Sequence, residues 1–126
     1  MLPWSPLSGG FLTGKFRREQ KGPAGARRTE FNFPPVDERV YDAVDALDAI
    51  AGARGVSIAQ VALAWLLAQP VVTSVIIGAN KMAQLEDNLR AAELRLTGEE
   101  VARLSAATAP PVLYPQWMVE RQNEGR

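Results

Sequence analysis

The pattern of hydrophobic and polar positions predicts four helices after residue 37. The first helix begins at about Asp37 and ends at Gly52 or Gly55, since glycine commonly stops a helix. Its apolar positions recur at helical spacing and are Val40, Val44, Leu47 and Ala51. One face of this helix should therefore pack against a core.

The second helix, residues 58–69, is apolar almost all round, which predicts burial on more than one side. Ser57 is its expected N-cap, and Gln60 three residues later completes a capping box. Pro70 ends the helix because the proline ring cannot continue it.

Residues 71–77 are β-branched and nearly all apolar, without alternation, which is typical of a strand buried on both faces of a parallel sheet. Gly78 then allows a tight turn, and Asn80 is the expected cap of the third helix. The predicted apolar face of that helix carries Met82, Leu85, Leu89 and Ala92.

A fourth helix begins at a second capping box, formed by Thr97 and Glu100, and runs to about Thr108. Before the helices, residues 2–7 should be extended, because each proline there moves its predecessor out of the helical region. A glycine-containing turn follows, through Gly9, Gly10 and Gly14.

Strands separated by helices place the chain in the α/β class. Two strands make a poor sheet, however, since both edges would expose unpaired backbone groups, so the pattern looks cut from something larger. We expect one incomplete domain with four regions: 1–14, a long basic loop 15–37, helices and a strand over 38–108, and a tail 109–126.

Composition argues against nucleic-acid binding, membrane binding, disulfides and metal sites. Apolar residues make up 47%, which suits a folded chain, and fourteen basic side chains balance fourteen acidic ones. We therefore expect no general attraction to nucleic acid or to an anionic membrane. The chain has no cysteine and no histidine, so we expect no disulfide and no metal site.

We expect a cytoplasmic protein. The longest apolar stretch, residues 58–68, is too short to span a bilayer. The residues after Met1 lack the basic and apolar segments of a signal peptide.

The strongest candidate for a ligand-binding site is the junction between the predicted strand 71–77 and the next helix. A helix N-terminus presents free backbone N–H groups and a partial positive charge, and both favour a phosphate. Lys81 adds a full positive charge where the helix dipole alone would prefer an acid. On the residues alone, a solvated surface lysine is the commoner explanation, and both interpretations stay open.

Two other nucleotide motifs are weaker. Residues 9–15 fit the first seven positions of a P-loop, but Phe16 stands where a serine or threonine would hold magnesium. The basic stretch 15–28 has Phe16 as its one aromatic residue, so a solvated loop is favoured over a nucleic-acid site.

Residues 75–89 resemble the last strand and following helix of the aldo-keto reductases, in which Ile-Gly-Ala precedes a small polar residue, a basic residue, Gln-Leu and Asn. The resemblance implies that Asn80 and Lys81 contact the adenosine 2′-phosphate of NADPH, with Gln84 and Asn88 on the adenine side. Ile77 and Gly78 complete this part of the implied cofactor site. The family more often has serine or threonine at Asn80 and arginine at Lys81, and lysine lacks the bidentate fork of arginine.

Residues 4–16 resemble a second segment of the same family, Tyr-Ser-Pro-Leu followed by Leu-Thr-Gly-Lys, with Trp4 in place of the tyrosine. In the family this is the end of barrel strand seven and the start of a loop over the cofactor pyrophosphate. The implied contact residues are Ser5, Pro6, Leu7, Leu12 and Lys15.

The resemblance implies a partial (β/α)8 TIM barrel, made of the last two βα units plus additional helices. A complete barrel needs about 250 residues. The family's catalytic tyrosine, lysine, aspartate and histidine come from earlier strands, and neither Tyr41 nor Tyr114 matches the catalytic position. We therefore predict no catalytic residue here, with Tyr41 as a packing or surface residue.

Three functions remain open. The chain is the C-terminal cofactor-binding part of an NADP(H)-dependent reductase of aldehydes or ketones, inactive alone. Alternatively it is a stand-alone, non-catalytic nucleotide-binding module. The third possibility is a half-barrel that pairs with itself or with a missing N-terminal half-barrel, which would cover its open strand edges.

Overall fold

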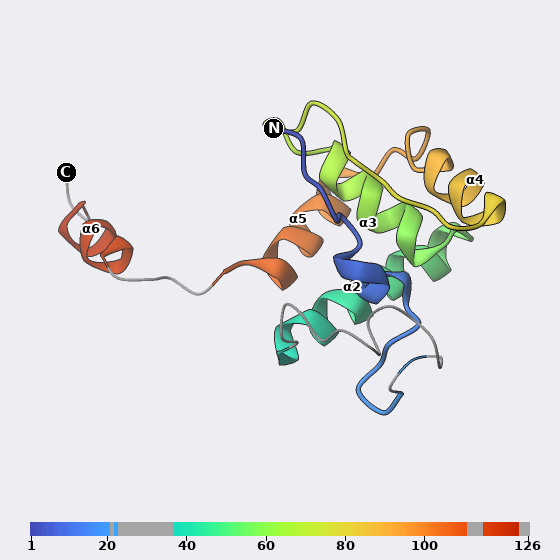
Figure 1. Ribbon diagram of the computed structural model, residues 1–126. Coiled ribbons are helices and arrows are strands. Elements are labelled where there is room, and N and C mark those ends of the chain that lie inside the picture. Colours follow the sequence, from blue (N-terminus) through green and yellow to red (C-terminus); the bar gives the residue numbers. More distant parts are fainter. Residues whose placement is uncertain (21, 23–36, 111–114, 124–126) are drawn as a thin grey trace.

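The computed structural model describes residues 1–20, 22, 37–110 and 115–123. Within these ranges the chain forms a short 3₁₀ helix and a set of α-helices (Figure 1). The elements are η1 (Ser8–Thr13), α2 (Glu38–Arg54), α3 (Ile58–Leu67), α4 (Met82–Arg90), α5 (Gly98–Thr108) and α6 (Gln116–Asn123).

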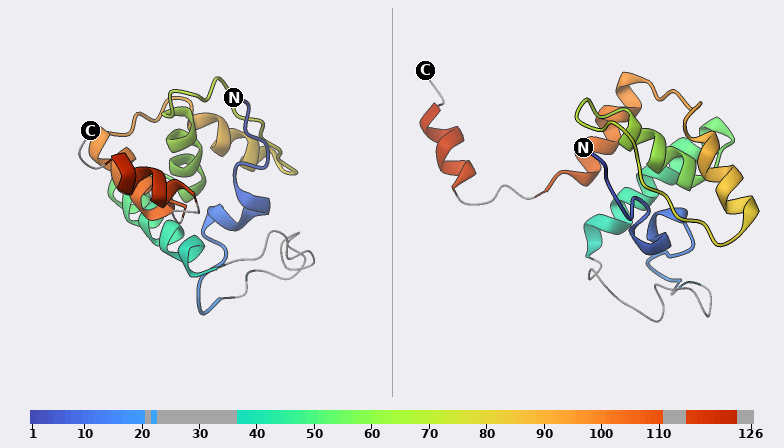
Figure 2. Two further views of the ribbon diagram at one scale, coloured as in Figure 1. Left: turned by 90° about the vertical axis from the view of Figure 1, so that its left-hand side faces the viewer. Right: turned by 45° about the horizontal axis from the view of Figure 1, so that its top comes forward.

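Helix α3 is the centre of the fold. Helices α2 and α4 and the 3₁₀ helix η1 pack against it, and α5 packs against α2 (Figure 1). Every residue from Ile58 to Ala64 is buried, which confirms the prediction of a helix buried on more than one side. Helix α6 stands apart from the other helices in Figure 1 and in the right-hand view of Figure 2.

The core joins three helices. Its fully buried members include Val61 of α3 and Leu104 of α5, next to Leu47 and Ile50 of α2. At the edge of this core the indole N–H of Trp65 donates to the hydroxyl of Ser105 at 3.1 Å. The apolar spacing predicted for residues 37–51 is thus confirmed as the buried face of α2.

The predicted helix starts are confirmed, with one difference. The side chains of Asp37 and Ser57 accept hydrogen bonds from the backbone N–H groups of Val40 and Gln60. The side chain of Gln60 does not return to Ser57 to close a capping box. It donates instead to Asp87 of α4, at 2.6 Å.

Helix α2 ends at a glycine, and α3 ends three residues before Pro70. Gly55, rather than Gly52, ends α2 in the left-handed conformation, and its backbone N–H bonds to the carbonyls of Ala51 and Gly52. Helix α3 ends at Leu67, ahead of the predicted Gln69.

The capping box at the start of α5 is confirmed, and it also binds α2. Glu100 accepts from the backbone N–H of Thr97 at 2.7 Å while Thr97 accepts from that of Glu100. The same carboxylate receives two N–H groups of Arg54 at 2.9 and 2.6 Å. These bonds, with Arg54 first, lower the pKa of Glu100 to about 2.

The two predicted strands do not form in the described residues, so the partial barrel is not confirmed there. Their segments run side by side and form an isolated parallel bridge between Trp4 and Ile76. The backbone N–H of Ile76 donates to the carbonyl of Pro3 at 2.9 Å, and that of Thr73 to the carbonyl of Met1 at 3.0 Å. The physical reason is that no further strand flanks the pair among the described residues, so each segment bonds to the other on one side only.

The third predicted helix is present as α4, but two details were wrong. Lys81, not Asn80, is its N-cap residue, and no side chain caps it. The side chains of Met82 and Leu89, expected to face a core, are 68% and 58% exposed. Asn88 is buried instead, since α4 meets α3 through polar contacts at Asp87.

The turn predicted through the glycines is the 3₁₀ helix η1, in which Gly9 and Gly10 have positive φ and Phe11 is buried. Gly14 ends η1 with φ of 77°, and a Cβ there would lie 2.4 Å from Cδ1 of Ile58. A side chain at Gly14 would therefore be strained by the left-handed backbone conformation, and it would also displace the terminal methyl group of Ile58.

The predicted basic loop is described at residues 15–20 and 22, and its remaining residues lie outside the described ranges. The described part is not simply solvated. A bridge between Arg17 and Gln20 closes a turn, and Arg17 and Arg18 form ion pairs with α2.

In the described ranges no single helix is long and apolar enough to cross a membrane. Helices α2 and α3 together would meet the length and composition needed, but the pair is bent by 103°.

We predict that Leu104→Ala lowers the free energy of unfolding by about 2–5 kcal/mol, because Leu104 is fully buried where α5 joins the core. Urea unfolding followed by circular dichroism measures the change. The exposed neighbour Arg103 supplies a control, since Arg103→Ala should cost about 0.5 kcal/mol or less. Equal losses in the two variants would contradict this account of the core.

A second prediction concerns acid stability. The folded-state pKa of Glu100, about 2, lies below its ordinary value of 4.5, so its contribution is complete above pH 4.5 and is lost as the pH falls toward 2. Glu100→Gln should be less stable at pH 7 and lose less stability on acidification than the unsubstituted chain. Urea midpoints at pH 7 and pH 3 measure this, and Glu99→Gln, next to it in the first turn of α5, is the control. The same pH response in both variants would refute the role of Glu100.

Candidate cofactor-binding site

The two segments that carry the implied cofactor residues meet at the Trp4–Ile76 bridge. Because the bridge is parallel, both segments leave it in the same direction, toward Ser5 on one side and Ile77 on the other. Segments more than 70 residues apart in the sequence thereby lie side by side at the bridge, and beyond it one leads to η1 and the other to α4 (Figure 1). Trp4 and Ile76 themselves are exposed, at 78% and 54%.

Ser5 has an unusual backbone conformation. Its φ is 54°, and that of Ser8 is 51°, both in the left-handed region that side chains other than those of glycine, asparagine and aspartate rarely adopt. The carbonyl of Ser5 accepts the backbone N–H of Ser8 at 2.9 Å, which closes the turn into η1. Such strained positions concentrate at ligand sites.

The other N-terminal candidates divide into two groups. Leu7 and Leu12 pack against the core, and the carbonyl of Leu7 accepts the N–H groups of Gly10 and Leu12, so their side chains turn inward. Pro6 is half-buried, and Lys15 is exposed just after η1.

The C-terminal candidates follow the bridge into α4. Ile77 and Gln84 are half-buried, whereas Gly78 and Asn80 are exposed. The backbone N–H of Asn80 donates to Oε1 of Gln84 at 3.3 Å, so that oxygen is already engaged. No described residue pairs with the amide nitrogen of Gln84.

Lys81 and Asn88 also carry side-chain groups that no described residue pairs with. Lys81 is exposed at the helix N-terminus, α4 has no acid in its first turn, and no described carboxylate pairs with this ammonium. Asn88 is 8% exposed, and its side-chain amide has no hydrogen-bond partner among the described residues. Unsatisfied buried amides are costly, which makes Asn88 a candidate for binding a ligand.

Lys81, Gln84 and Asn88 lie on one face of α4, because they are separated by three and four residues. The partial positive charge of the helix N-terminus adds to that of Lys81 on this face. The arrangement suits an anionic group with a polar, planar group beside it. A cavity between α2 and α5, lined by Ala49 and Arg103 among others, contains none of these residues.

The sequence profile of the Aldo/keto reductase family matches residues 1–109, which include both segments and all the candidate positions. This chain belongs to the aldo/keto reductase family. The resemblance stated from the two motifs is thereby confirmed.

Several curated relatives support the assignment. The chain is 40% identical over 113 residues to a probable voltage-gated potassium channel subunit beta of Oryza sativa subsp. japonica, covering 84% of this chain and 34% of the relative. It is 40% identical over 108 residues to Protein tas of Escherichia coli K12, covering 84% and 31%. It is 33% identical over 109 residues to an L-glyceraldehyde 3-phosphate reductase of Escherichia coli O157:H7, covering 82% and 32%.

This aldo/keto reductase chain thus spans about a third of the length of the curated relatives it matches. The family implies a (β/α)8 barrel, whereas the described residues form helices and one isolated bridge between two extended segments.

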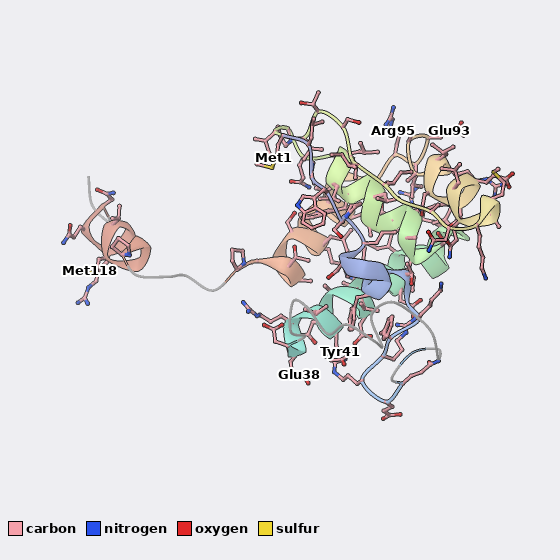
Figure 3. The ribbon with its side chains drawn as sticks, in the orientation of Figure 1. Met1, Glu38, Tyr41, Glu93, Arg95 and Met118 are labelled. Carbon is pink, nitrogen blue, oxygen red and sulfur yellow. The ribbon has the colours of Figure 1, made fainter. Side chains whose placement is uncertain are left out.

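A contact that was not predicted from the sequence of this aldo/keto reductase chain links the basic loop to α2. Arg18 pairs with Glu38, Asp42 and Asp45, and these carboxylates, Asp45 first, raise the pKa of Arg18. The signal was present, because acidic residues at spacings of four and three form a stripe on one face of α2. Figure 3 shows Glu38 and Tyr41 on α2, beside the segment that follows η1.

Tyr41 is confirmed as a packing residue. Its ring meets that of Phe11 edge to face at 5.4 Å, and the guanidinium of Arg18 lies 5.6 Å from the ring centroid. Phe11 also stacks on Phe16 at 5.3 Å. These contacts hold the first residues of the basic loop against α2.

Proposed function

We propose that this chain is the C-terminal cofactor-binding part of an NADP(H)-dependent oxidoreductase of aldehydes or ketones, and that it does not reduce a carbonyl by itself. The observation that carries the proposal is the parallel pairing of Trp4 with Ile76, which places the starts of both implied cofactor segments side by side. In this proposal the paired segments correspond to the last two strands of the barrel. The proposed protein is cytoplasmic.

The residues of these two segments fit the cofactor. NADPH would supply the hydride, while this chain would bind and orient its adenosine end. Lys81 and the N-terminus of α4 would hold the 2′-phosphate, and the unpaired amide of Asn88 would meet the adenine. The strained turn at Ser5 supports a role for its backbone near the pyrophosphate.

A second candidate function is supported by the exposed apolar surface of the paired segments. Trp4, Val71 and Ile76 are all more than half exposed, and the pair has unbonded backbone groups on its outer sides. A half-barrel that assembles with a second copy or with an N-terminal fragment would cover them. In that case cofactor binding would appear in the assembly and not in the monomer.

We predict that Lys81→Ala weakens NADPH binding roughly 10- to 100-fold, the value of about one charge-assisted hydrogen bond. NADH binding should change little, since NADH lacks the 2′-phosphate. Fluorescence titration of the purified 126-residue chain measures both affinities, and light scattering on the same sample gives its mass.

Arg90→Ala is the matched control for Lys81→Ala. It also removes one positive charge from α4, but at the last turn of the helix. Equal effects of the two variants, or no preference for NADPH over NADH, would count against a phosphate site at Lys81. Turnover of an aldehyde with NADPH by the pure chain would refute the proposed inactivity.

A further inference from the structure

Asp87 of α4 lies against the N-terminus of α3, with both carboxylate oxygens engaged. The hydroxyl of Ser57 donates to Oδ2 at 2.6 Å, and Nε2 of Gln60 donates to Oδ1 at 2.6 Å. The carboxylate is half-buried and Gln60 is buried. Bonds of this kind to an ionised acceptor are stronger than those between neutral groups.

Ser57 has two roles in this contact. Its oxygen accepts the backbone N–H of Gln60 at 3.1 Å and so caps α3, while its one hydroxyl proton goes to Asp87. Helix α3 has no acidic residue in its own first turn. Asp87 therefore supplies, from another helix, the negative charge that a helix N-terminus favours.

Among the described residues, the side-chain hydrogen bonds that join α4 to another helix are those of Asp87. The helix has nine residues and no side-chain N-cap, and its large apolar side chains Met82 and Leu89 are mostly exposed. Each residue turns a helix by about 100°, so holding Asp87 also fixes the direction of its neighbour Asn88. Lys81 and Gln84, on the same face as Asn88, are fixed with it.

We propose that Asp87 is a positioning residue for the anionic cofactor. By binding Ser57 and Gln60 it holds α4 against α3 and sets the direction in which Lys81 and Asn88 meet the nucleotide. The inference rests on the proposed function as far as the ligand is concerned. The anchoring of α4 does not depend on any ligand.

The sign of the effect separates positioning from simple electrostatics. Asp87→Asn removes a negative charge from the helix that would hold a phosphate, so Coulomb's law alone predicts tighter NADPH binding. Positioning predicts the opposite, a loss of about tenfold in affinity. Glu86→Gln, an exposed neighbour on α4, removes the same charge without the contact to α3 and should leave affinity unchanged or slightly increased.

Gln60→Met separates positioning from direct contact between Asp87 and the nucleotide. Gln60 belongs to α3 and is outside the set of implied cofactor residues. If Asp87 acts through its contact with α3, Gln60→Met should also lower NADPH affinity, and the double variant should be no weaker than the weaker single variant. An effect of Asp87→Asn with none of Gln60→Met, or fully additive losses, would overturn the positioning role.

Hydrogen exchange of the ligand-free chain tests the anchor itself. Amides of residues 85–90 in α4 should exchange about tenfold faster in Asp87→Asn and in Gln60→Met, with those of α5 unchanged. Unchanged exchange in α4 would overturn the proposal whatever the nucleotide data show. If exchange rises as expected but the unsubstituted chain binds no NADPH, the anchor stands and the proposed function fails. Should Asp87→Asn not fold, Gln60→Met carries both measurements.

Discussion

The burial of α3 is the constraint on which the rest of the structure depends. Its first seven residues have almost no polar surface apart from Gln60, so water must be excluded from nearly every side of the helix. Helix α2, the 3₁₀ helix η1 and α4 supply that cover, and Leu104 of α5 closes the core behind Val61. Gly14, where η1 meets the first residue of α3, has a left-handed backbone conformation that favours glycine.

Polar contacts then orient elements that apolar packing alone would leave free to rotate. Glu100 caps α5 and binds Arg54 of α2 with the same carboxylate, so the start of one helix is tied to the end of another. Asp87 does the equivalent for α4 and α3 through Ser57. In both cases a residue that caps a helix also takes part in the hydrogen bonds that join that helix to a second one.

Sequence patterns predicted most of the helices because their signals are local. Ser57, Thr97 and Glu100 act within a few residues of themselves, and the apolar spacing of α2 needs no partner to be recognised. The rotation of α4 was not predictable in this way. Its apolar stripe through Met82 and Leu89 predicted one buried face, but both side chains are exposed. The hydrogen bond that orients α4 joins Asp87 to Gln60, 27 positions earlier in the sequence.

The residues of the candidate site could be predicted from the sequence, but the directions of their side chains could not. The two motifs identified Ser5, Lys81 and Asn88 through the family resemblance, and nothing in their spacing indicated that Leu7 and Leu12 would turn their side chains into the core. The strands failed for a related reason. A parallel strand in the middle of a sheet has neighbours on both sides, and in the described part of the chain residues 71–77 pair with one segment, Met1 to Trp4.

The pairing with residues 1–4 holds the two candidate cofactor segments side by side although the described residues form no sheet. The carbonyls of Met1 and Pro3 receive N–H groups from Thr73 and Ile76, so the register between the two segments is fixed by their own hydrogen bonds. Register determines which residues leave the bridge together, and here they are Ser5 and Ile77. The two cofactor segments therefore start side by side because of this pairing, and the core contacts of Leu7 and Leu12 and the hydrogen bonds of Asp87 hold the residues that follow.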